Sequence, residues 1–157
     1  MTISTGDSIL KFGTQDEITV ASPSTVSDSA FSTTSDINSW TNDDDSHFAA
    51  AILEGHFNTT MPTTGKMQLF TQPLNIADTT KDARPPSSNY FKEFCGDFII
   101  DFGVAADTDF IMIIPFFELP MFKTNQELQF YIYNYNTSQV FDGWSLWIIP
   151  LTNGPHG

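Results

Sequence analysis

The most constraining feature of this sequence is the alternation of side chains over residues 127–135. One set of alternate positions is aliphatic or phenylalanine and the other is mainly tyrosine: Leu128, Phe130 and Ile132 against Gln129, Tyr131, Tyr133 and Tyr135. Successive side chains of a β-strand point to opposite faces, so a period of two predicts a strand with one face on a core. The three tyrosines then share the other face.

Segments of strand length recur from residue 47 to the C-terminus. They comprise residues 48–57, 66–74, 94–102, 110–117, 127–135 and 144–150, separated by turns rich in Asn, Asp, Gly, Ser and Thr. No segment of ten or more residues shows the 3.6-residue period of an amphipathic helix. Residues 110–117 are apolar at nearly every position, which predicts a central strand buried on both faces.

These patterns predict an all-β chain that forms an antiparallel β-sandwich. The strands are uneven in length and are interrupted by one long polar excursion at residues 77–89, which favours a jelly roll. An immunoglobulin-type sandwich is disfavoured because Cys95 is the only cysteine. A chain of 157 residues is long enough for one domain with a substantial core.

Residues 1–45 differ in composition from the rest. Serine and threonine supply ten of the nineteen positions from 21 to 39. We expect an extended N-terminal arm over residues 1–45, with one possible edge strand near residues 18–20, followed by the sandwich domain over residues 46–157. The arm is either a flexible tail or a segment that becomes ordered on a partner, with Phe31 and Trp40 as its anchors.

The charge of the chain excludes several classes of partner. Nineteen acidic residues against six basic ones give a formal net charge of -13. Phosphate groups repel such a chain, so we expect no nucleic-acid binding and no adsorption to anionic lipid. No stretch approaches the roughly 20 apolar residues of a membrane span. The N-terminus does not resemble a secretory signal, so we expect synthesis in the cytoplasm.

Common catalytic motifs are absent from the sequence. The sequence contains no GxSxG, GxxxxGK[ST] or GxGxxG pattern. The three histidines lack the spacing of a zinc site, and the acidic clusters do not follow the spacing of a calcium loop. We therefore expect a protein that is not an enzyme and that has no catalytic residue, metal or cofactor.

Exposed aromatic residues are the remaining candidates for a binding site. Tyr131, Tyr133 and Tyr135 share one strand face, and Trp147 lies in the next strand along the chain. Rigid amphipathic rings of this kind stack on sugars or cover subunit interfaces. Alternatively, the rings pack beneath the N-terminal arm or the second sheet. With Phe31 and Trp40, these four form the predicted partner-binding set.

The C-terminal third also carries a family resemblance. Residues 127–135 read ELQFYIYNY and residues 142–150 read DGWSLWIIP, followed by Thr152 and Gly154-Pro155. With residues 48–57 and 66–76, these motifs resemble a group of small acidic virion proteins of tailed bacteriophages. The similarity extends from residue 47 onward and does not include residues 1–45.

This resemblance implies a head decoration, or cement, protein. Such a jelly-roll subunit is made in the host cytoplasm, sits on the outer capsid surface of the virion and stabilises the shell by binding neighbouring major capsid proteins. No catalytic residue comes with it. Self-association as a dimer or trimer is also expected. The alternatives are a lectin-like carbohydrate-binding module that adheres to host glycans, and a tail or baseplate adaptor.

Charge distribution adds one expectation about the arm. Residues 1–64 contain nine acidic residues and one basic residue, Lys11. The arm is therefore predicted to be an acidic strap that lies in a basic groove of its partner, and binding through it is expected to weaken in salt.

Overall fold

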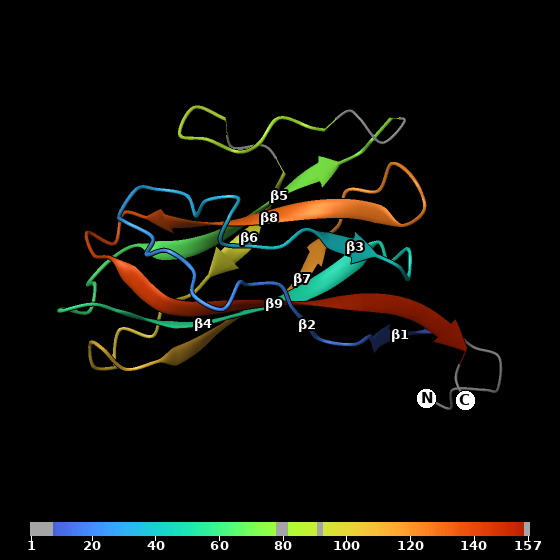
Figure 1. The fold of residues 1–157 in the computed structure, drawn as a ribbon. Coiled ribbons are helices and arrows are strands. Elements are labelled where there is room, and N and C mark those ends of the chain that lie inside the picture. The colour runs from blue at the N-terminus through green and yellow to red at the C-terminus, as the bar shows by residue number, and fades with distance from the viewer. Residues whose placement is uncertain (1–7, 78–81, 91–92, 156–157) are drawn as a thin grey trace.

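The structure is a computed structural model that describes residues 8–77, 82–90 and 93–155. Two antiparallel sheets pack face to face in these residues (Figure 1), which confirms the predicted β-sandwich. The strands are β1 (Ser8–Phe12), β2 (Asp16–Glu17), β3 (Trp40–Asn42), β4 (Phe48–Phe57), β5 (Lys66–Leu74), β6 (Phe94–Phe98), β7 (Phe110–Glu118), β8 (Gln126–Tyr135) and β9 (Phe141–Pro155). Within the described ranges, no helix has the length and apolar character needed to cross a membrane.

The order of the strands identifies the type of sandwich. The first sheet has the order β1-β9-β4-β7, with β2 also paired to β9, and the second has the order β3-β8-β5-β6. From β2 to β9 the chain changes sheet at every connection except the one between β5 and β6. This is the interleaved arrangement of a jelly roll, as the sequence predicted.

The main core lies between the two sheets. On β8, Leu128, Phe130 and Ile132 are fully buried there, as the alternation predicted. Leu53 of β4 and Leu146 of β9 meet them from the opposite sheet. Fully burying a side chain of this size stabilises a fold by roughly 1.5–3 kcal/mol, so the two inner faces hold the sheets together.

Strand β7 differs from the prediction of a central strand. It pairs with β4 alone and forms an edge of the first sheet. Met112 and Ile114 point into the core, whereas Ile111 and Ile113 point outward and are exposed. Pro115 also suits an edge, because it has no N–H to give to a second neighbour. The prediction was wrong because an apolar run shows only that both faces avoid water, not that both are covered within this chain.

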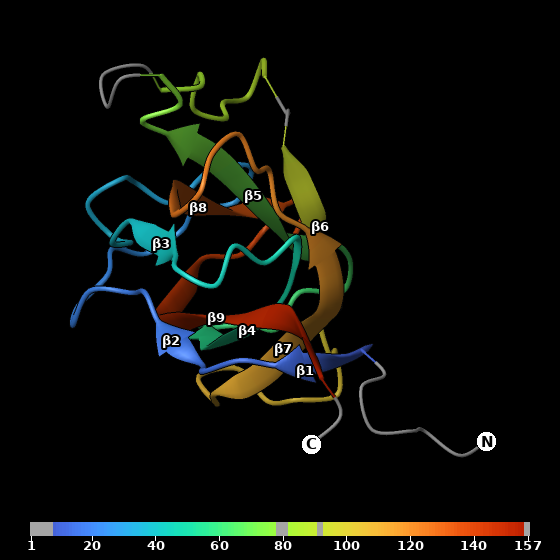
Figure 2. The same cartoon turned by 90° about the vertical axis from the view of Figure 1, so that its right-hand side faces the viewer.

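Residues 8–45 lie against the sandwich. β1 and β2 pair with β9, and β3 pairs with β8, so this segment is attached to both sheets. Figure 2 shows β2 and β3 on the side of the sandwich away from β6. Its apolar residues join the common core: Ile18, Val26, Ile37 and Trp40. The polar composition predicted an extended arm, but four spaced apolar side chains and the open sheet edges are enough to fix the segment in place. Residues 1–7 of the expected arm lie outside the described residues.

Trp40 illustrates this placement. Its side chain is only 6% exposed, and its indole N–H donates a hydrogen bond of 2.9 Å to the Asp16 carboxylate. The ring packs against Phe130 with the centroids 6.2 Å apart. Trp40 therefore fills the core of its own chain, which differs from the expected role as an anchor on a partner.

The polar excursion begins after β5, and its residues 78–81 lie outside the described residues. The described part returns to the sheet, because the Ala83 N–H donates to the Pro73 carbonyl at 2.9 Å. The Gln72 amide donates to the Ala83 carbonyl at 2.7 Å. Ala83 is thus held on the end of β5.

Candidate functional site

The predicted tyrosine face lies on the outer side of the second sheet. Tyr131 and Tyr133 are buried there with Phe70, and Phe31 covers them from the N-terminal segment. The rings of Phe31 and Tyr133 lie 4.4 Å apart, and the backbone of Phe31 forms a β-bridge to Tyr133. Among the alternatives drawn from the sequence, packing beneath the N-terminal segment is the one the structure shows for Tyr133.

The buried Tyr131 hydroxyl donates a hydrogen bond of 2.6 Å to the Gln72 side-chain oxygen. Burial and the nearby Asp82 carboxylate raise the pKa of Tyr131, so its hydroxyl stays protonated. Tyr135, at the end of β8, is 40% exposed and is the tyrosine of this strand most open to a ligand.

Trp147 does not join the tyrosines. It lies on β9 in the first sheet, half-buried on the outer side of that sheet. The tyrosines and Trp147 therefore occupy opposite surfaces of the sandwich. Adjacency along the sequence was misleading, because the connection between β8 and β9 changes sheet.

The outer side of the first sheet carries an extensive apolar surface, which we call the outer apolar face. Its members come from β1, β4, β7 and β9: Phe12, Phe48, Ile52, Ile111, Ile113, Phe116, Trp147 and Ile149. Ile113 is 55% exposed and Phe116 is 52% exposed. Nothing in the described part of the chain lies over them.

Strand register makes this face continuous. Ile52 is paired with Ile113 on one side and with Trp147 on the other, so the three form one row across β7, β4 and β9. In the adjacent part of the face, Phe116 stacks on Phe48 with the ring centroids 4.6 Å apart. Aromatic and branched side chains in neighbouring strands pack well in such rows.

Acidic residues border the outer apolar face. Glu17 is paired with Trp147, Glu54 with Ile111, and Glu118 with Phe48. The face therefore presents an apolar centre with carboxylates at its margin. Interfaces between proteins commonly combine an apolar core with a polar rim in this way.

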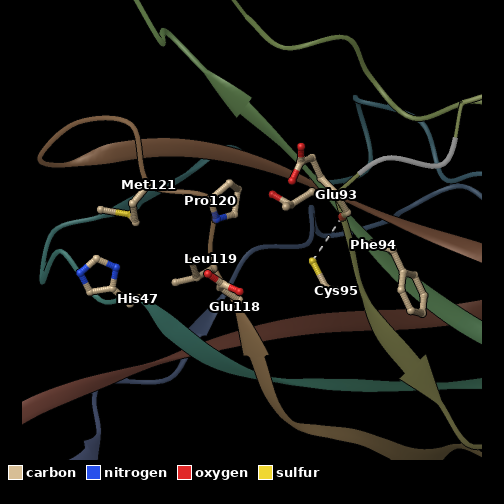
Figure 3. Close-up of a pocket in the computed structure, with 9 residues that line it drawn as sticks. His47, Glu93, Phe94, Cys95, Glu118, Leu119, Pro120 and Met121 are labelled. Atoms are coloured by element: carbon tan, nitrogen blue, oxygen red, sulfur yellow. Dashed lines mark hydrogen bonds between the residues drawn. The ribbon is translucent and has the colours of Figure 1, made fainter.

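A separate cavity of about 400 Å³ lies between the start of β6 and the end of β7. Figure 3 shows Glu93 and Cys95 on one side of it and His47 on the other, with Leu119 and Pro120 between them. The Cys95 thiol donates to the Glu93 carbonyl at 3.6 Å. Burial and the Glu93 charge raise the pKa of this thiol, which holds it protonated and poorly nucleophilic.

Metal-ligating side chains do not converge anywhere in residues 8–77, 82–90 or 93–155: no three His, Cys, Asp or Glu residues are placed to share an ion. The space between the sheets is filled by the apolar core. Candidate binding sites in the described residues therefore lie on the outer surfaces of the two sheets and at their edges, not between the sheets.

The outer apolar face was not among the sites predicted from the sequence. Only Trp147 of its members was a candidate, and it was grouped with the tyrosines. The available signal was the double-sided apolar run at residues 110–117, combined with Phe48, Ile52 and Ile149 on neighbouring strands. Recognising it required the strand order, because only the order puts these segments side by side.

The fold and these surfaces define a jelly-roll protein with an apolar sheet face that the described residues leave uncovered. Neither a family model nor a curated protein matches the sequence. Among solved structures, this chain is similar to a chain of the structure of infectious bursal disease virus, Gx strain, with a TM-score of 0.37 and 10% identity. The alignment covers 96% of this chain and 33% of that chain, so this chain spans a third of its length. A similarity of this size assigns no function.

Proposed function

We propose that this protein is a structural virion protein, a capsid decoration or cement subunit that binds the outer capsid surface and stabilises the shell without catalysing a reaction. The observation that carries the proposal is the outer apolar face on a jelly-roll domain. In this proposal, that face is the docking surface.

Energetics support docking through this face. Monomeric soluble proteins rarely expose contiguous apolar patches larger than a few hundred Å². The outer apolar face draws aromatic and branched side chains from four strands, with Ile113 and Phe116 about half exposed. Covering one such side chain stabilises a complex by up to about 1.5–3 kcal/mol.

The fold is compatible with this role but does not define it. Jelly rolls occur in viral capsid domains, and they also occur in lectins and cupins. One fold hosts many functions, so the role of this protein depends on its surface. The resemblance of residues 127–135 and 142–150 to tailed-phage virion proteins favours the capsid among these roles.

Charge indicates the chemistry of the partner. Glu17, Glu54 and Glu118 border the face, and the whole chain has a net charge of -13. Two copies meeting through this face would bring their acidic margins together, whereas a partner with basic residues around an apolar surface would complement it. We propose the major capsid protein, presenting such a surface at joints between its subunits, as that partner.

The test is sedimentation with capsids assembled from the major capsid protein alone. The wild-type chain is expected to sediment with them, and Ile113→Glu is expected to remain in the supernatant because it places a charge among the exposed apolar side chains of the face, beside Ile52. The matched control is Ile99→Glu, because Ile99 is 83% exposed just after β6, away from the face. Equal sedimentation of both variants would contradict the docking assignment.

Two further outcomes count against the proposal. The first is a dimer of the free wild-type chain that Ile113→Glu converts to monomer, which would assign the face to self-association. The second is imaging of intact particles that places the subunit on the tail or baseplate, which would support the adaptor alternative.

A further inference from the structure

The second sheet carries a groove on its outer side, opposite the outer apolar face. It has a volume of about 470 Å³ and is formed by β5, β6 and the end of β8. Its lining combines aromatic rings with a small polar cluster: Lys66, Gln68, Phe70, Phe94, Asp97 and Tyr135. We call it the aromatic groove. It shares no residue with the proposed docking surface.

Two partly exposed rings mark the ends of this groove. Phe94 is 50% exposed and Tyr135 is 40% exposed. Lys66 is paired with Tyr135, and Phe70, four positions further along β5, is paired with Phe94. With about 3.3 Å per residue and about 4.8 Å between strands, their backbones lie about 16 Å apart. Such a span exceeds a single sugar ring.

Buried rings hold the exposed ones in place. Phe94 lies 5.3 Å from Phe70, and Tyr135 lies 6.2 Å from Tyr133, as measured between ring centroids. Phe31 joins the two pairs, because it contacts both Phe70 and Tyr133. The ring faces are therefore preorganised, which reduces the entropy lost when a ligand binds.

A fixed polar cluster lies between the rings. The Asp97 carboxylate accepts a hydrogen bond of 2.5 Å from the Lys66 ammonium and one of 2.8 Å from the Gln68 amide. Lys66 and Asp97 are each about one-third exposed, so a ligand can reach them. A carboxylate oxygen has further lone pairs, and the ammonium has further N–H groups. The cluster thus offers acceptors and donors to hydroxyl groups.

The geometry points to a binding site for a neutral oligosaccharide in the aromatic groove. Sugar rings present C–H faces that pack on aromatic rings, and their hydroxyls both donate and accept hydrogen bonds. Pockets that bind such ligands combine apolar walls with a few placed polar groups. The charges of Lys66 and Asp97 cancel within the cluster, and the net charge of -13 disfavours anionic glycans.

This inference goes beyond the proposed capsid role, since it assigns a different ligand to the opposite surface. It also relocates the sugar-binding alternative drawn from the sequence. Tyr133 is covered by Phe31, and Trp147 lies on the other sheet, so Tyr135 and Phe94 are the rings that a sugar reaches.

The experiment is binding of the full chain to an immobilised panel of neutral hexasaccharides of glucose, mannose, galactose and N-acetylglucosamine, with sialylated and sulfated glycans for comparison. At least one neutral hexasaccharide is expected to bind. Phe94→Ala and Tyr135→Ala are each expected to weaken it about two- to tenfold, and Asp97→Asn is expected to weaken it as well. Phe122→Ala is the matched control, because Phe122 is an exposed ring outside the groove.

Three outcomes would overturn the inference: no neutral hexasaccharide is retained, an anionic glycan binds more tightly, or Phe122→Ala weakens binding as much as Tyr135→Ala. Circular dichroism of each variant shows whether it is folded. Capsid sedimentation of Tyr135→Ala separates the two proposals, because it is expected to equal that of the wild-type chain whether or not a glycan binds.

Discussion

At the scale of single residues, Asp36 shows how the polar N-terminal segment is organised. Its carboxylate accepts hydrogen bonds of 2.8 Å from the Ser24 N–H, 2.8 Å from the Thr33 N–H and 2.7 Å from the Thr33 hydroxyl. Burial acts to raise the pKa of Asp36, but these bonds outweigh it, and the pKa lies below its ordinary value of 3.8. The ionised carboxylate therefore stabilises this loop.

We predict that Asp36→Asn lowers the free energy of unfolding at pH 7 by about 1–3 kcal/mol, because it replaces charge-assisted hydrogen bonds. A carboxyl group whose pKa is lowered by folding stabilises the fold above its unfolded pKa, and this contribution disappears as the pH falls through the folded pKa. The difference in free energy of unfolding between the variant and the wild type, measured by urea denaturation, is therefore expected to shrink below pH 3.8. A difference that increases as the pH is lowered would contradict the role given to the Asp36 carboxylate.

Gly65 shows a second constraint at this scale. It precedes β5 with a φ of +96°, and a Cβ there would lie 2.6 Å from the carbonyl oxygens of Tyr135 and Asn136. Both the backbone conformation and the space require glycine.

We predict that Gly65→Ala costs about 1–3 kcal/mol of stability through backbone strain, measured as a lower urea midpoint. Gly103→Ala is the comparison, because Gly103 has no positive φ and a Cβ there meets a single side-chain atom at 3.1 Å. Equal urea midpoints for the two variants would show that the close approach of Gly65 to the Tyr135 and Asn136 carbonyls does not require glycine.

At the scale of elements, the N-terminal segment determines how the sandwich is closed. Backbone hydrogen bonds attach it to both sheets: the Ile18 N–H donates to the Leu146 carbonyl at 3.0 Å, and the Ser32 N–H donates to the Ile132 carbonyl at 2.8 Å. The Trp144 indole N–H also donates a hydrogen bond of 2.9 Å to the Ser24 carbonyl. The segment thus contributes edge strands and core residues to the same unit as β4–β9.

We predict that Trp40→Ala destabilises the whole domain by about 3–5 kcal/mol, because it leaves a cavity between the sheets. Tryptophan fluorescence and far-UV circular dichroism are expected to report a single coincident urea transition, shifted to lower urea. Phe122→Ala, at a ring that is 59% exposed, is expected to change the midpoint little. Loss of structure confined to residues 8–45 would contradict one common core.

At the scale of the whole molecule, the two sheets present different outer surfaces. The first sheet exposes an apolar face with an acidic margin, and the second carries the aromatic groove with its balanced polar cluster. The net charge of -13 acts over the whole surface. Association with a basic partner is therefore expected to depend on salt, whereas binding of a neutral ligand is not.

We predict that raising the salt from about 0.05 M to about 0.5 M slows association with capsids about tenfold. Binding of a neutral hexasaccharide is expected to change less than twofold over the same range. Stopped-flow light scattering measures the first quantity and calorimetry the second. A capsid association rate independent of salt would contradict the charge argument for the partner.

The sequence by itself determined the long strands from β4 to β9. Strands β4 and β5 begin and end at the predicted residues, and the alternation on β8 correctly separated Leu128, Phe130 and Ile132 from the tyrosines. These features are local, because side-chain direction in a strand follows from the backbone period of two. The short strands β1, β2 and β3 and the C-terminal extension of β9 were missed, because each is defined by pairing with a distant strand rather than by its own pattern. The edge strand expected near residues 18–20 was wrong, since Thr19 forms only an isolated bridge to Ile37 there.

Only the tertiary structure decided which surfaces exist. It separated Trp147 from the tyrosines, placed β7 at an edge with Ile113 exposed, and buried Trp40 in the core. Each of these outcomes depends on which strands become neighbours, and that order is set by long-range packing between segments far apart in the chain. A local period indicates that a side chain avoids water, whereas the neighbours decide whether this chain or a partner covers it.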